Sequence, residues 1–222
     1  MLGWLLASLV APLALGTLAV LVLESQRSGD IERERLATLA GTLARGVEAE
    51  LAHAQTQLEV LAVSPQFARG DLRQLHTFAT SVAQDSPGSA IALIDAHGQG
   101  ELSTAVPWGE PLPNYWTIVE AGRQVPWNGG ALRVGAEDLS RSALEQDKVA
   151  YSDLFYGVNV RRPALALSLP VENDAGERHA FVMIFSPDLL QEMVTKSVSG
   201  SGVRAIVTDR NGVVIEIGRA HV

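Results

Sequence analysis

The segment PALALSLPVENDAGERHAFVMIF, residues 163–185, decides the fold of this chain. Along its first strand one face carries Leu165, Leu167, Leu169 and Val171, and the other carries Ala164, Ala166, Ser168 and Pro170. The turn-forming residues 173–176 follow, and residues 179–185 form a second apolar run. The segment therefore predicts an antiparallel hairpin at the centre of a sheet.

A second hairpin is predicted on the N-terminal side of the first. The apolar run 90–94 is followed by Asp95 and Gly98, which suit the first and fourth positions of a type I turn. The same pattern of apolar strand, Asp and Gly returns at 205–212. We interpret this faint repeat as the start of a second, similar module, and we expect the sequence to be part of a longer chain.

Residues 26–63 contain no proline, and their apolar side chains recur in steps of three and four. This spacing predicts one long amphipathic helix, roughly 57 Å in length. The dipeptide Ser64-Pro65 ends it. Its apolar stripe has to be covered, either by the domain that follows or by a second copy of the helix. The second alternative predicts a homodimer.

Shorter elements follow from capping residues and from composition. Asp71 is the expected N-cap of a helix, and residues 186–188, Ser-Pro-Asp, open another. Residues 107–130, rich in Pro, Gly and Trp, predict a loop with one short helix that starts near Asn114. Residues 151–155 predict a strand.

An uncharged apolar run occupies residues 2–23. A bilayer core needs roughly 20 apolar residues in a helix. The alternative is a cleaved signal peptide, which has a shorter apolar stretch after a basic start; this run is longer and no Lys or Arg precedes it. We therefore expect a retained membrane anchor, with the lipid bilayer as a partner.

Composition excludes several classes of protein. The chain of 222 residues has no cysteine and a net charge of −8. The missing cysteines exclude disulfide scaffolds, zinc ribbons and thiol enzymes, and the negative charge disfavours nucleic acid as a partner. The five histidines show no metal-ligand spacing, and no catalytic motif is present. Asp95 and Asp209 are expected to cap turns rather than to catalyse. We therefore expect no enzyme activity in this chain and no cofactor.

Several segments together suggest a family. They are LAVSPQFARGDLRQL (61–75), IALIDAHGQGELSTAVPWGEPLP (91–113), YSDLF (151–155) with PALALSLPV (163–171), and RAIVTDRNGVVIE (204–216). Their order resembles the extracytoplasmic sensor region of bacterial transmembrane receptors of the double Cache (PAS-like) type, most closely the N-terminal part of a sensor histidine kinase.

The resemblance implies a receptor of the bacterial inner (cytoplasmic) membrane whose sensor part is periplasmic or extracellular. It also implies a small-molecule pocket in the membrane-distal module, dimerisation through the long helices, and signalling by helix displacement. The aromatic-Arg-Trp-Tyr signature of amino-acid-binding members is not found here, so the class of ligand is not carried over.

The predicted fold class is α+β, an antiparallel PAS-like sheet with flanking helices. We expect a transmembrane anchor at 1–23, an amphipathic stalk helix at 24–63, a membrane-distal sensor module at 64–200, and the beginning of a second PAS-like module at 201–222.

Polar and aromatic residues near the central strands are the candidate ligand-binding residues. They are Trp108, Trp127, Tyr151, Asp153, Tyr156 and Arg161. Arg161 or its neighbour Arg162 could hold a carboxylate bidentately, and the small side chains of the first central strand would leave room on one sheet face. Two alternatives stay open: a single-anchor protein that uses a PAS-like domain for assembly, and an exported enzyme.

Overall fold

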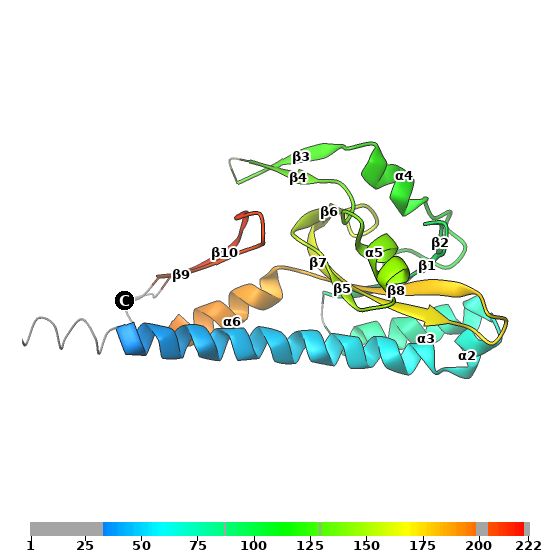
Figure 1. The fold of residues 1–222 in the computed structure, drawn as a ribbon, viewed down its shortest axis with the longest axis horizontal. Coiled ribbons are helices and arrows are strands. Elements are labelled where there is room, and N and C mark those ends of the chain that lie inside the picture. The colour runs from blue at the N-terminus through cyan, green and yellow to red at the C-terminus, as the bar shows by residue number, and fades with distance from the viewer. Residues whose placement is uncertain (1–32, 87, 129, 199–203, 220–222) are drawn as a thin grey trace, which may run out of the picture. The chain divides into compact units, whose positions relative to one another are not determined.

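The computed structural model describes residues 33–219 except for 87, 129 and 199–203 (Figure 1). The predicted anchor at 1–23 and the first part of the predicted stalk lie outside this range. Within the described residues, no helix is both long and apolar enough to cross a bilayer. The chain divides into two compact units, Met1–Arg45 and Gly46–Val222. The described part of the first unit, residues 33–45, is helical, and helix continues to residue 62.

The second unit is built on a six-stranded antiparallel sheet. Its strand order is β2-β1-β8-β7-β5, and β6 also pairs with β7. The strands are β1 (Ala90–Asp95), β2 (Gly100–Ser103), β5 (Ala150–Tyr151), β6 (Phe155–Gly157), β7 (Arg162–Glu172) and β8 (Arg178–Phe185). The predicted central hairpin is confirmed, since β7 and β8 pair in register from Leu165–Phe185 to Glu172–Arg178.

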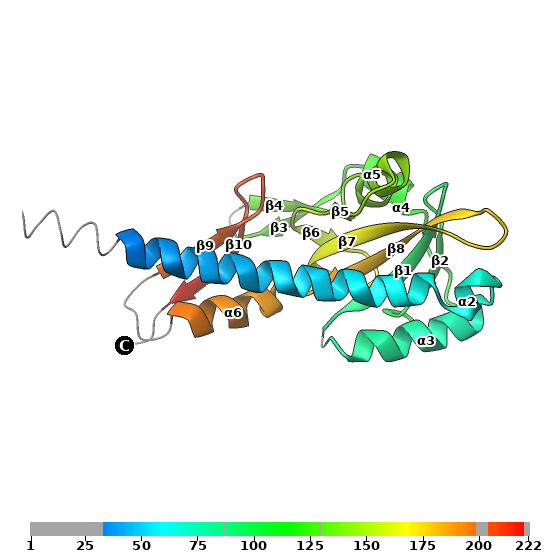
Figure 2. The ribbon, with the colours of Figure 1, turned by 60° about the horizontal axis from the view of Figure 1, so that its bottom comes forward.

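Helices cover both faces of this sheet (Figures 1 and 2). On one side lie α2 (Pro65–Ala68) and α3 (Leu72–Gln84), and on the other lie α4 (Tyr115–Glu120) and α5 (Leu139–Gln146). The predicted cap Asp71 is confirmed, because it accepts a hydrogen bond from the Gln74 N–H at 3.1 Å. The short helix predicted to start near Asn114 is also confirmed, and Asn114 caps it by accepting from the Thr117 N–H at 3.1 Å. The last helix, α6 (Asp188–Val198), begins after Ser186 and Pro187, as expected.

The two faces of β7 differ as the sequence predicts. Leu167 belongs to the larger core together with Leu58, Leu61 and Leu75, which are all fully buried. Each such leucine contributes roughly 1.5–3 kcal/mol through its removal from water. Ala164 and Ala166 lie in a second core, on the face covered by α5. Small side chains on this second face leave space between the sheet and its covering segments.

Two predicted segments differ from the structure. Residues 107–130 are not simply a loop, because β3 (Gln124–Trp127) pairs with β4 (Gly130–Arg133). The predicted strand 151–155 is interrupted, and its two ends form β5 and β6. The interruption has a local cause. The Ser152 N–H still donates to the Ala166 carbonyl at 2.9 Å, but the Ala166 N–H donates to the Ser152 hydroxyl at 2.8 Å and not to a backbone carbonyl.

The hairpin β9 (Arg204–Thr208) and β10 (Val214–Arg219) forms a separate two-stranded sheet that packs against α6. Its turn matches the β1–β2 turn: one carboxylate oxygen of Asp209 or Asp95 accepts hydrogen bonds from the backbone N–H groups two and four residues later, at 2.8–2.9 Å. The expected capping role of both residues is confirmed. Asn173 makes the same turn between β7 and β8. The likeness of the turns is therefore a local property and does not by itself indicate a repeated module.

Candidate functional site

A cavity lies on the small-residue face of the sheet, beneath α4 and α5; we call it the sheet-face cavity. Its floor is formed by Ala92 and Ile94 of β1 and by Val182 and Ile184 of β8. Other apolar lining residues are Val119, Ala136, Leu139, Phe155, Val158 and Val160. The cavity volume is about 60 Å³, which is room for about four water molecules. The cavity therefore suits a compact, largely apolar guest.

Two polar side chains meet inside this cavity. The Asn159 amide donates a hydrogen bond to the Tyr115 hydroxyl oxygen at 2.6 Å. Burial raises the pKa of the Tyr115 phenol to about 12, and the hydrogen bond from Asn159 lowers it by a smaller amount. The hydroxyl is therefore protonated at neutral pH, and its proton is available to an acceptor on a guest.

Three charged residues line the cavity at α4 and α5, and they neutralise one another in part. The Arg141 guanidinium bonds Glu120 at 2.7 Å and lies 3.7 Å from Asp138. The central guanidinium carbon of Arg141, Cζ, also lies 4.5 Å from the centre of the Trp116 ring. The hydrogen bond to Glu120 raises the pKa of Arg141. The Trp116 indole N–H in turn donates to the Ser140 hydroxyl at 3.0 Å, so the Trp116 ring is held beside the Arg141 guanidinium.

The six residues predicted from sequence lie elsewhere, and none lines the sheet-face cavity. Trp108 is exposed, and the centre of its ring lies 5.6 Å from the centre of the His76 ring. Trp127 packs in a third core beside Leu132 and Tyr156. Tyr156 donates its hydroxyl proton to the Arg161 carbonyl at 2.8 Å, so these two residues are brought together. The Arg161 side chain is exposed and its backbone is left-handed, with φ of 52°.

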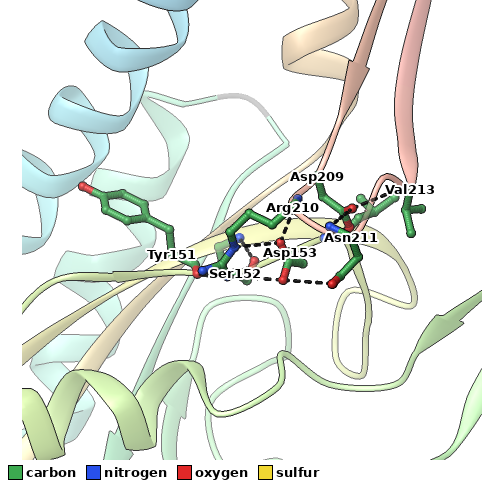
Figure 3. Close-up of polar contacts among 9 residues, drawn as sticks. Tyr151, Ser152, Asp153, Asp209, Arg210, Asn211 and Val213 are labelled. Carbon is green, nitrogen blue, oxygen red and sulfur yellow. Dashed lines mark hydrogen bonds and ion pairs between the residues drawn. The ribbon is translucent and has the colours of Figure 1, made fainter.

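Tyr151 and Asp153 meet a different partner, the turn of the β9–β10 hairpin (Figure 3). Asp153 accepts hydrogen bonds from Arg210 Nε at 3.0 Å and Nη2 at 3.2 Å, and from Asn211 Nδ2 at 3.2 Å. Arg210 also donates to the Tyr151 carbonyl at 3.1 Å. In return, Asp209 accepts from the Leu154 N–H at 3.2 Å. We call this set, residues 151–154 with 209–211, the hairpin clamp.

The hairpin clamp and the sheet-face cavity share a segment of chain. Residues 153–155 also line a second cavity of about 170 Å³, which the turn residues Asp209 and Asn211 line from the other side. Phe155 and Gly135 belong to the walls of both cavities. The Gly135 N–H donates to the Tyr156 carbonyl at 3.0 Å, which fixes the two walls together. Phe155 of the cavity wall and Asp153 of the hairpin clamp are two residues apart along the chain.

The cavity residues Asn159, Arg141 and Ser140 carry no signal in the sequence. Two signs of the cavity are present in the sequence: the aromatic pair Tyr115 and Trp116 beside the short helix, and the small side chains on one face of the first central strand. Within the described part of the chain, no group of three or more His, Cys, Asp and Glu residues could hold a metal ion.

Comparison with protein-family models and with curated proteins finds no match. Solved structures do match. The ligand-binding domain of the Campylobacter jejuni chemoreceptor Tlp3 in complex with L-valine has a TM-score of 0.58 at 10% identity, over 82% of this chain and 67% of that one. The sensor domain of the Vibrio cholerae histidine kinase DctB has a TM-score of 0.53 at 12% identity, over 85% and 66%.

An extracellular ligand-binding receptor from Desulfohalobium retbaense matches with a TM-score of 0.57 at 15% identity, over 80% of this chain and 30% of that one. The chain thus spans about two thirds of the Tlp3 and DctB domains. At these identities the likeness is one of fold. The chain has the Cache-like fold of the ligand-binding sensor domains of bacterial receptors.

Proposed function

We propose that this chain is the extracytoplasmic small-molecule-sensing input region of a transmembrane signal-transduction receptor, namely a two-component sensor histidine kinase. The observation that carries the proposal is the sheet-face cavity. It is apolar, it lies between a rigid sheet and two short helices, and a few polar groups converge on it, which is the usual composition of a small-molecule site. The Tlp3 domain, which shares the fold, was solved with L-valine and with isoleucine.

The hairpin clamp supplies an output for this site. A guest that displaces Phe155 would alter the clamp at Asp153, and through Arg210 it would alter the seating of the β9–β10 hairpin. The hairpin stands where the sequence predicts the second module. In this proposal residues 1–23 anchor the protein in the bacterial inner membrane, the sensor part lies outside it, and the long helix pairs with a second copy.

A ligand screen on a matched pair of variants tests the proposal. Val119 of α4 lines the cavity and is half-buried, so Val119→Phe fills the space from its edge. Ala175→Phe adds a phenyl group in the exposed β7–β8 turn and is the control. Thermal-shift screening of a broad metabolite set should give hits with the native chain and with Ala175→Phe, and those hits should vanish with Val119→Phe.

Hits that survive Val119→Phe would move the site elsewhere. The absence of any hit would favour the alternative function, in which the domain serves assembly through protein contacts.

A further inference from the structure

We infer that the sheet-face cavity takes a compact, uncharged molecule with an apolar body and one hydrogen-bond acceptor, and that it discriminates against free carboxylates. This inference rests on the proposed sensing function and adds the chemical class of the ligand. It follows from the distribution of charge and hydrogen-bonding groups around the cavity.

The floor of the cavity offers nothing to a charge. The β1 and β8 residues there are Ala, Ile and Val, and their side chains are buried or partly buried. An ionised group placed against them loses its water and gains no partner, which is strongly unfavourable. The part of the ligand that reaches the sheet is therefore apolar.

The basic group that lines the cavity is already occupied. Arg141 is the one Lys or Arg among the described lining residues, and it is engaged by Glu120, by Asp138 and by the Trp116 ring. With one positive and two negative side chains, the formal charge of this group is −1. A ligand carboxylate would have to displace Glu120 and would face a net negative edge. The arginines that the sequence suggested for a carboxylate, Arg161 and Arg162, do not line the cavity.

The remaining polar groups suit a neutral acceptor. The Tyr115 hydroxyl oxygen is used as an acceptor by Asn159, and among the described residues nothing accepts its proton. A hydroxyl that stays protonated can donate one hydrogen bond to a carbonyl, hydroxyl or amide oxygen of a guest. Tyr115 belongs to α4 and Asn159 to the segment after β6, and both line the cavity, so the Tyr115 hydroxyl lies at the cavity wall where these two segments meet.

A series of small molecules that share an isopropyl group and differ in charge tests the inference. Isobutyramide is neutral with an acceptor, isobutyrate is an anion, isobutylamine is a cation at neutral pH, and L-valine is a zwitterion. Their dissociation constants would be measured by ligand-observed saturation-transfer NMR on the full chain in lipid nanodiscs. We expect isobutyramide to bind at least tenfold more tightly than the other three, and Val119→Phe to abolish its signal.

Tyr115→Phe separates the hydrogen bond from the shape of the cavity. It removes the donor and keeps the ring, so the affinity for isobutyramide should fall about fivefold while the native hydrogen-exchange pattern of β1 and β8 is retained. An unchanged affinity in this variant would overturn the role of the hydroxyl.

Failure of the inference and failure of the sensing function give different results. If isobutyrate, isobutylamine or L-valine binds as tightly as the amide and is lost in Val119→Phe, the ligand class is wrong and the site stands. If no member of the series binds but a charged metabolite from the screen binds at this cavity, the ligand class is again wrong. If nothing binds in either experiment, both proposals fall.

Discussion

The substitution Asp153→Asn should release the β9–β10 hairpin without unfolding the sheet. Asparagine keeps the shape of the side chain but has no charge and only one acceptor oxygen. It can keep the contact of Arg210 Nε to one oxygen, at 3.0 Å, but it loses the contacts of Arg210 Nη2 and Asn211 Nδ2 to the second oxygen, both at 3.2 Å. The hydrogen bond that Arg210 donates to Asp153 also raises the pKa of Arg210, so charge is part of the contact.

The expected magnitude is modest because the Arg210 side chain is 73% exposed, while that of Asp153 is 29% exposed. A solvated ion pair of this kind contributes at most about 1 kcal/mol, and the lost hydrogen bond from Asn211 adds a similar amount. A loss of about 1–2 kcal/mol multiplies the population of the detached hairpin by roughly 5–30.

Hydrogen exchange followed by mass spectrometry measures this population directly, because local opening limits exchange in native proteins. Peptides that cover β9 and β10 should exchange about 5–30 times faster in Asp153→Asn, and peptides from β7 and β8 should be unchanged. Asp147→Asn is the matched control, since it removes an exposed carboxylate that pairs with Arg178 at 3.2 Å, far from the hairpin along the chain. Unchanged exchange in β9 and β10, or equal acceleration in β7 and β8, would refute the clamp.

Three further predictions concern the stability of the second unit, each measured by chemical unfolding. The Glu101 carboxylate lies 3.1 Å from His179 Nε2 and raises the pKa of this buried histidine above its usual 6.5. This pairing stabilises the folded state by an amount of order 1 kcal/mol, which is complete below about pH 6.5 and is lost as the pH rises through the folded-state pKa. His179→Gln should therefore flatten the curve of unfolding free energy against pH between pH 6 and 8, and a curve parallel to that of the native chain would contradict the pairing. In Gly98→Ala, at a φ of 84°, the new Cβ would lie 2.4 Å from Trp116 Cγ. In Gly70→Ala, at a φ of 68°, which is also in the left-handed region, the new Cβ would meet nothing within 4 Å. Gly98→Ala should therefore lower the unfolding free energy by about 1–3 kcal/mol more than Gly70→Ala, and equal losses would contradict the close contact with Trp116. Leu58→Ala, at a fully buried position, should lower the unfolding free energy by about 2–5 kcal/mol. Val63→Ala, at a position that is 82% exposed, should change it by no more than about 0.5 kcal/mol. A large loss of stability in Val63→Ala would show that another surface covers this side chain.

What the sequence predicts well is what local chemistry decides. The β7–β8 hairpin is readable because its side chains alternate and because Asn173 forms a turn within five residues. The β3–β4 hairpin escapes prediction because β3 contains Pro126 and its turn depends on Asn128 adopting a φ of 43°. Proline and a left-handed asparagine both indicate a loop when they are read in isolation.

The candidate site is less readable because its members meet only through tertiary packing. The bond between Tyr115 and Asn159 joins residues 44 positions apart, and the bond between Trp116 and Ser140 spans 24 positions. The sequence predicts a ligand-binding role for Asp153, whose partners in the structure lie 57 and 58 positions further along the chain. Composition can mark such residues as interesting without indicating which surface they meet.

The interruption between β5 and β6 is the feature that joins the cavity to the hairpin clamp. A continuous strand from 150 to 157 would place alternate side chains on opposite faces of one sheet, and each would stay locked in the ladder of β7. Because Ser152 takes over a ladder hydrogen bond with its side chain, Asp153 and Leu154 are free to hold the turn of the β9–β10 hairpin while Phe155 returns to the wall of the cavity. Three consecutive residues thus contact the two places that a sensor has to connect. If this segment transmits occupancy, a ligand that fills the cavity should change the exchange of β9 and β10 in the native chain, and the change should be smaller in Asp153→Asn, where the connection is already weakened.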